Sequence, residues 1–167
     1  SLAMGLQSRC EGTGSIAAGF SSYNYGEYSI LCGAHTFNSG HHSICGGSTV
    51  NVSGSNSLGI GTLVTVSGEN AMGMGSFSHA AGDESFAGGT SSQANSLNSF
   101  AFGNSNMVNN ENAAAFGAFC HANGINSFAI GRSSTASPYA SFVSGQYNEN
   151  IAGSSASWVD TDPLFVL

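Results

Sequence analysis

The sequence repeats itself every fourteen residues, and this period constrains the fold more than any other feature. Cutting the chain at residues 1, 15, 29, 43, 57, 71, 85, 99, 113, 127 and 141 aligns SLAMG, SIAAG, SILCG, SICGG, SLGIG, AMGMG, SFAGG, SFAFG, AAAFG, SFAIG and SFVSG. The fifth position is glycine in all eleven repeats, with no insertion or deletion between them. Consecutive repeats of one fixed length predict a solenoid in which each repeat is one coil stacked on the next.

A second glycine marks the twelfth position of most repeats, for example Gly12, Gly26 and Gly40. Two glycines seven residues apart predict two corners that divide each coil into two short strands, since glycine reaches positive φ at little cost. Asparagine recurs at the fourteenth position and also tolerates the left-handed region. We therefore predict an all-β fold, a parallel β-roll solenoid of eleven 14-residue repeats.

The side chains of the first strand predict which face is buried. The second position is mostly large and apolar, so we expect it to point into the roll. The third position is small or apolar and, by strand alternation, is expected to point outward. A strand without a polar face indicates burial on both sides, so we predict that the third position packs against another chain. These candidate interface residues are Ala3, Ala17, Leu31, Cys45, Ala87, Ala101, Ala115, Ala129 and Val143.

Charge and hydropathy exclude several classes of function. Charged residues make up 7% of the chain, the formal net charge is −7, and Arg9 and Arg132 are the only basic residues besides histidine. A chain without a basic stripe cannot neutralise a phosphate backbone, so we expect no nucleic-acid partner. No apolar run is long enough for a membrane span and no signal peptide is recognisable. We expect the membrane anchor and targeting signals to lie outside this segment.

No pattern in the sequence indicates catalysis, a cofactor or a metal. The four cysteines occupy different repeat positions, so we expect small buried hydrophobic residues and no disulfide ladder. Adjacent His41 and His42 fall at a predicted corner, where their side chains diverge, and we expect solvated turn residues there. A narrow rod offers shallow grooves in place of a deep pocket. We therefore expect a chain that is not an enzyme, with no catalytic, cofactor-binding or metal-binding residues.

Aromatic residues concentrate near the start of the chain, at Tyr23, Tyr25, Tyr28 and Phe37. Tyrosine-rich patches suit recognition of proteins or sugars, so these four residues form a candidate ligand surface. Packing between chains is an equally good explanation of the same residues.

The motif Ser-apolar-Ala-apolar-Gly, followed by Ser-x-Ala-x-Gly, resembles the YadA-like head repeat of trimeric autotransporter adhesins, which also occurs in phage-like tail fibres. The resemblance covers residues 1–154 and implies a left-handed roll and a homotrimer about a common axis. The sequence after this range changes character and contains the only tryptophan, Trp158. We predict a β-roll repeat domain over residues 1–154 and a capping or exit segment over residues 155–167.

These observations predict a non-catalytic segment of a trimeric surface fibre that mediates adhesion to host or environmental surfaces. The partners would be two further copies of the chain and an extracellular protein or glycan ligand. The alternative is a receptor-binding or spacer segment of a phage-like or contractile-injection tail fibre. The two alternatives predict an extracellular location, on the cell surface at the outer membrane or on a virion-like fibre.

Overall fold

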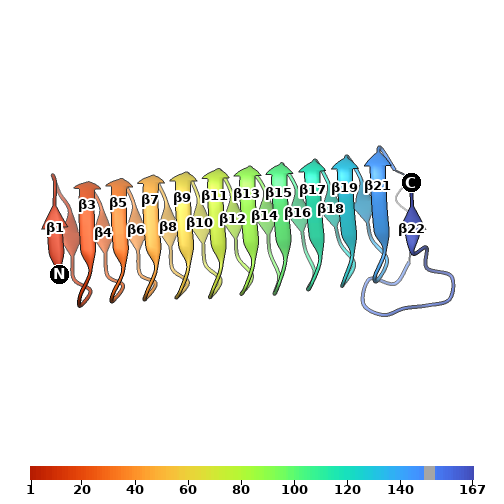
Figure 1. Cartoon of the computed structure of the whole chain (residues 1–167), viewed down its shortest axis with the longest axis horizontal. Coiled ribbons are helices and arrows are strands. Elements are labelled where there is room, and N and C mark those ends of the chain that lie inside the picture. Colours follow the sequence, from red (N-terminus) through yellow and green to blue (C-terminus); the bar gives the residue numbers. More distant parts are fainter. Residues whose placement is uncertain (149–152) are drawn as a thin grey trace.

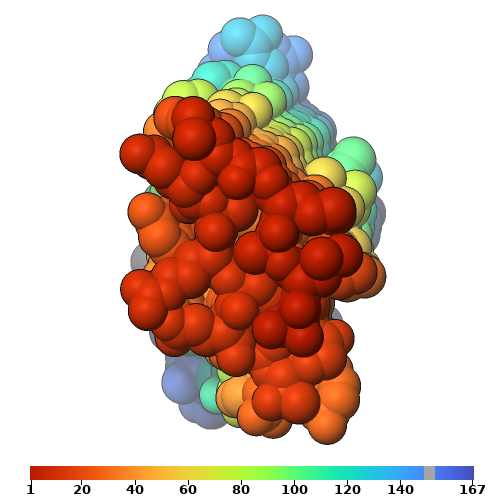
Figure 2. All heavy atoms as spheres, turned by 90° about the vertical axis from the view of Figure 1, so that its left-hand side faces the viewer, coloured from red at the N-terminus to blue at the C-terminus, as the bar shows by residue number. Residues whose placement is uncertain are grey.

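A computed structural model describes residues 1–148 and 153–167, and every regular element of this part is a β-strand. The strands stack side by side into a straight rod, with the two chain ends at opposite ends of the stack (Figure 1). Viewed along the rod from the N-terminal end, the later coils lie behind the first and the cross-section is narrow (Figure 2). The predicted parallel β-roll solenoid of fourteen-residue repeats is confirmed. Its handedness remains an implication of the family resemblance.

Two parallel sheets form the two sides of the rod. The twelve-stranded sheet contains β1 (Leu2–Met4), β3 (Ile16–Phe20), β5 (Ile30–Ala34), β7 (Ile44–Ser48), β9 (Leu58–Thr62), β11 (Met72–Ser76), β13 (Phe86–Thr90), β15 (Phe100–Asn104), β17 (Ala114–Ala118), β19 (Phe128–Arg132), β21 (Phe142–Gln146) and β22 (Phe165–Val166). The ten-stranded sheet contains β2 (Arg9–Cys10), β4 (Tyr23–Asn24), β6 (Phe37–Asn38), β8 (Asn51–Val52), β10 (Thr65–Val66), β12 (His79–Ala80), β14 (Gln93–Ala94), β16 (Met107–Val108), β18 (His121–Ala122) and β20 (Thr135–Ala136).

The strand register equals the sequence period. Ile16 pairs with Ile30, Ile30 pairs with Ile44, and the fourteen-residue offset continues without a slip to the pairing of Phe128 with Phe142. Residues at the same repeat position therefore form straight rows along the rod. A property of one repeat position consequently becomes a property of a whole face.

The structure inverts the predicted directions of the second and third positions. The third position points into the roll: Ala17, Leu31, Cys45, Ala87, Ala101, Ala115, Ala129 and Val143 are fully or almost fully buried within one chain. Ala3 is exposed because it lies in the terminal coil. The second and fourth positions point outward. Alternation along the strand was predicted correctly, but the faces were exchanged.

The third position is small because the space between the two sheets is thin. Valines of the short strands fill much of it, and a Cβ added at Gly59 would lie 2.5 Å from Cγ2 of Val52. A Cβ at Gly73 would likewise meet Val66 at 2.7 Å and Val64 at 2.8 Å. A large side chain therefore cannot enter at the third position of these coils, and bulky side chains have to point outward.

The corners of each coil are built by residues at the seventh and fourteenth positions, which have φ near +55° in coil after coil. The expectation for asparagine at the fourteenth position is confirmed, since Asn56, Asn70 and Asn112 have φ of 56°, 54° and 55°. The twelfth-position glycines were predicted to be corners with positive φ, but they are required by the close approach of the next coil. They are not in the positive-φ region, but a Cβ at Gly26 would lie 1.9 Å from the carbonyl oxygen of Gly40.

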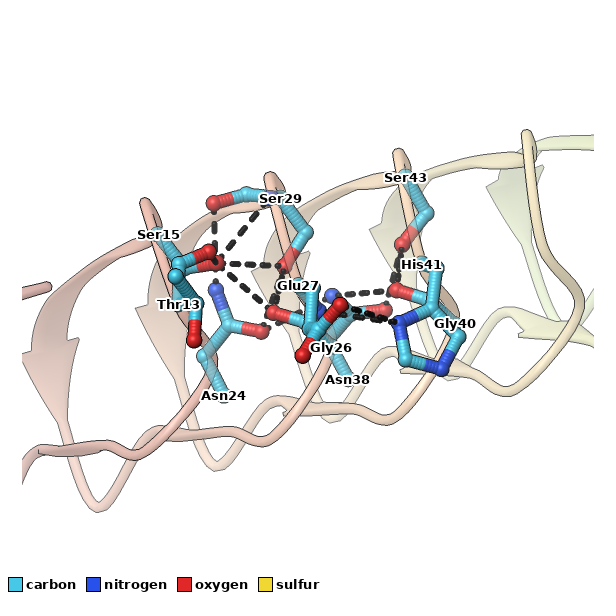
Figure 3. A network of polar contacts seen from close by, with 10 residues as sticks. All are labelled: Thr13, Ser15, Asn24, Gly26, Glu27, Ser29, Asn38, Gly40, His41 and Ser43. Atoms are coloured by element: carbon cyan, nitrogen blue, oxygen red, sulfur yellow. Dashed lines mark hydrogen bonds and ion pairs between the residues drawn. The ribbon is translucent and has the colours of Figure 1, made fainter.

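A buried polar ladder lines the corner near residues 24–43 (Figure 3). Asn38 donates from Nδ2 to Oδ1 of Asn24 at 2.9 Å. Ser29 donates its hydroxyl proton to Oδ1 of Asn24 at 2.8 Å, and Ser43 makes the same bond to Asn38 at 2.8 Å. Each buried amide is thus paired with the next coil, as buried polar groups must be. Because both partners in each of these bonds are side chains, the stacking of these coils depends on which residues occupy the positions.

The C-terminal segment returns to the rod, because β22 pairs in parallel with β21 through Phe142 and Phe165. Asp162 is almost fully buried, and its carboxylate accepts hydrogen bonds from the backbone amides of Ser154 and Val159 at 3.1 and 3.2 Å. The proposed boundary between repeat domain and cap at residue 154 adjoins residues 149–152, which lie outside the described part. This boundary remains a prediction.

Burial of Cys45 gives the roll a predictable response to alkaline pH. Desolvation raises the pKa of this thiol from 9.0 to about 12, so the folded chain keeps a proton that the unfolded chain loses. Stability from this group is complete below about pH 9 and should decline, by a few kcal/mol at most, as the pH rises toward 12. Comparing urea unfolding of the wild type and Cys45→Ala across this range isolates the effect. Parallel pH profiles of the two proteins would contradict it.

Candidate interaction surfaces

One face of the rod is a continuous apolar surface. It is formed by the second- and fourth-position side chains of the twelve-stranded sheet, and we call it the outer apolar face. Large hydrophobic residues on it remain 36–50% exposed in the single chain: Leu2, Met4, Ile30, Ile44, Ile60, Met72, Met74, Phe102, Ile130 and Phe142. Charged side chains are absent from these two positions throughout the repeats. An apolar surface that runs the length of a molecule marks an interaction site.

Stacked phenylalanines form the C-terminal half of the outer apolar face. Ring centroids are separated by 4.6 Å between Phe86 and Phe100 and by 5.0 Å between Phe100 and Phe116. The ninth repeat has Ala114 at the second position, and Phe116 reaches across from the fourth position, 5.4 Å from Phe128. Stacking at these distances is favourable, so the ladder continues without a gap.

The ladder also crosses into the C-terminal segment. Phe128 stacks on Phe142 at 5.2 Å, and Phe142 stacks on Phe165 of β22 at 5.3 Å. Phe165 itself remains 61% exposed. The outer apolar face therefore extends from the repeats onto the segment that follows them.

The four aromatic residues of the candidate ligand surface are all exposed. Tyr23 and Phe37 pair in register on β4 and β6, and the rings of Tyr25 and Phe37 lie 5.5 Å apart. These three residues share the solvent side of the ten-stranded sheet, opposite to the outer apolar face. Tyr28 lies separately at a corner, with φ of 51°, and stacks on His42 at 5.5 Å. The structure brings three of the four residues together.

The charged groups near this patch form isolated pairs. Nδ1 of His41 lies 4.0 Å from the carboxylate of Glu27, and Arg9 contacts Glu11. Within residues 1–148 and 153–167, no three histidine, cysteine or acidic side chains gather in a geometry that could hold a metal. The described residues also enclose no pocket. All four cysteines are free, with Cys45 and Cys120 buried and Cys32 on the outer apolar face.

An asparagine ladder on the exterior was not predicted. Asn95 donates from Nδ2 to Oδ1 of Asn109 at 3.0 Å, and Asn109 donates to Asn123 at 2.9 Å. Asn98 makes an equivalent bond to Asn112 at 3.1 Å on a parallel row. The signal was present in the sequence, since asparagines recur at the eleventh position at intervals of fourteen residues.

The YadA head domain repeat matches the chain twice, over residues 67–92 and 122–147. The strand register continues unchanged between and before these two matches, so the neighbouring coils repeat the same structural unit. Residues 67–92 and 122–147 are therefore similar to YadA head repeats, and the coils between and before them share their register. No curated protein is similar enough to the chain to count as a match. No membrane-spanning helix occurs in the part of the chain that the structure describes.

Proposed function

We propose that this chain is a non-catalytic segment of a trimeric surface fibre that mediates adhesion, with three parallel rolls packed through their outer apolar faces. The observation that carries the proposal is the row of exposed large hydrophobic residues along one side of the rod. Burial of such residues contributes about 25 cal/mol for each Å² removed from water. The number of three chains is supported by the similarity to the YadA head domain repeat.

The solution mass of the chain, measured by light scattering, tests the assembly. We expect three times the chain mass of 16.8 kDa. A folded chain with the mass of one copy would overturn the trimer and leave the outer apolar face to another partner.

Adhesion is assigned to the opposite side of the rod, which would face away from the shared axis. Tyr23, Tyr25 and Phe37 present exposed rings there, and aromatic rings with polar edges are frequent contact residues. Three copies in one fibre would carry three such patches, so weak contacts could add by avidity.

Retention of coated beads tests this role. Beads carrying the wild-type chain are applied to a panel of immobilised purified glycans and extracellular matrix proteins. On any surface that retains them, the variant Tyr23→Ser with Tyr25→Ser should lower retention about tenfold or more, as expected for loss of central aromatic contacts. Thr135→Ser, on the same face but near the other end, is the matched control and should change nothing. Equal retention of both variants would contradict the assignment of the patch.

A further inference from the structure

Large side chains project from one corner of the rod in four of the eleven coils. Four large residues at the seventh position project from it: Leu63, Phe77, Phe119 and Tyr147, with exposed fractions of 42, 57, 51 and 64%. We call these four residues the corner ridge. The ridge lies where the long strands end, along the side to which their arrowheads point (Figure 1). It borders the outer apolar face, because only two residues separate the seventh position from the fourth.

The residues of the corner ridge have an unfavourable backbone conformation. Phe77 and Phe119 have φ of 58° and 57°, a region that bulky side chains rarely adopt. Their amides donate to carbonyl oxygens of the preceding coil, from Phe77 to Thr62 at 2.9 Å and from Phe119 to Asn104 at 2.8 Å. Serines at the same position, such as Ser91, make the same turn with the same bond. The turn therefore does not require an aromatic side chain.

The opposite corner, at the fourteenth position, shows the composition that this backbone favours. Asparagine occupies it in five repeats: Asn56, Asn70, Asn98, Asn112 and Asn126. The seventh position has nearly the same φ in every coil but contains no asparagine in eleven repeats. The acidic side chains Glu27, Glu69, Asp83, Glu84 and Glu111 also lie at or beside the fourteenth-position corner. The fourteenth-position corner also carries an exposed aromatic residue, Tyr28, with φ of 51°. The two corners therefore differ in their acidic side chains, although their backbones are alike.

A closed ring of three chains requires two different contact patches on each chain. A three-fold axis relates copies head to tail, so the surface that one chain offers to its neighbour differs from the surface that it receives. The outer apolar face can supply one patch. The second must be apolar and adjacent to the first, and the charged fourteenth-position corner is unsuitable because burying unpaired carboxylates is costly.

We propose that the corner ridge is this second patch, and that it packs against the outer apolar face of a second copy of this chain. The inference rests on the trimer of the proposed function and specifies its contacts. Rotation about an axis parallel to the rod keeps equivalent coils level. Phe77 of one copy would therefore lie level with Met72 and Met74 of its neighbour, and Leu63 with Leu58 and Ile60.

The test replaces two ridge residues by asparagine, the residue that the backbone at this corner tolerates. The variant Leu63→Asn with Phe77→Asn should keep the strand signal in circular dichroism. Its trimer should dissociate at a concentration at least about tenfold higher than that of the wild type, as measured by sedimentation. Ala140→Asn is the matched control, with φ of 54° at the opposite corner, and should leave dissociation unchanged.

The outcomes separate the two proposals. A wild-type trimer whose dissociation is unaffected by the double variant overturns the corner ridge and leaves the trimer intact. A monomeric wild type overturns both. A photo-cross-linking phenylalanine analogue at position 77 gives an independent measurement: covalent multimers after irradiation of the trimer are expected, and cross-links confined to one chain would overturn the inference.

Discussion

Replacing Gly47 with alanine is expected to abolish stacking of the central coils, whereas the same replacement at the neighbouring Gly46 should be almost neutral. A Cβ at position 47 would lie 1.9 Å from the carbonyl oxygen of Gly61, and the φ of 124° is itself rarely adopted by residues with a Cβ. The obstructing atom is backbone of the next coil, so it cannot move aside without breaking the register of the sheet. We expect a loss of about 4 kcal/mol or more in the free energy of unfolding.

Gly46 is a demanding control because it lies in the same strand, β7. A Cβ there would meet nothing nearer than the carbonyl oxygen of Cys32 at 3.6 Å, an ordinary contact. Ala18 already occupies the equivalent position two coils earlier. Its effect should therefore be within about 0.5 kcal/mol. Thermal unfolding at one fixed protein concentration measures both variants, and similar losses in both would show that the coil spacing is not set by close backbone contact.

The repeat period predicted the fold well because it is a property of the backbone. Glycine at the fifth position of the first ten repeats is required by the close approach of the next coil, and the fourteen-residue interval becomes the register of both sheets directly. Asparagines such as Asn56 and Asn70 indicated a left-handed corner for the same local reason. These signals act through the backbone and do not depend on which face of a strand is buried.

The faces could not be assigned in the same way, because their assignment depends on the distance between the two sheets. Large residues such as Ile30 and Phe100 were predicted to fill the roll, and small residues such as Ala101 to face another chain. The distance between the sheets is short enough that valines from the short strands, including Val52 and Val66, occupy the core opposite small third-position residues. Hydrophobicity alone does not distinguish these two arrangements, since both faces of the strand are apolar.

The candidate sites were affected to different degrees by this error. Tyr23 and Phe37 were predicted to belong to a candidate ligand surface, and both are exposed on the short strands, while their binding role stays a prediction. The candidate interface residues were chosen by the reversed face and, apart from Ala3 in the terminal coil, lie inside the single chain. With the faces corrected, the proposed contact between chains is formed by the second- and fourth-position residues of each long strand. Phe102, next to the buried Ala101, is one of them.

Two adjacent glutamate substitutions should therefore have opposite consequences. Ala101 is fully buried within the chain, so Ala101→Glu would place a carboxylate in the thin core without a partner. Burying an unpaired charge costs several kcal/mol, and we expect this variant to lose its β-sheet signal in circular dichroism. Phe102 is 50% exposed in the single chain. Phe102→Glu should keep the β-sheet signal, because its side chain points away from the core.

Phe102→Glu should instead weaken the association of the chains. Three carboxylates would enter the apolar contact between chains, and the mass measured by light scattering should fall from three chains toward one at 16.8 kDa. Gln93→Glu, on the outer side of β14, introduces the same charge on the opposite sheet and should change neither folding nor mass. If Ala101→Glu remained folded but lost its partners while Phe102→Glu remained trimeric, the third position would be the contact between chains. The outer apolar face would then need a different partner.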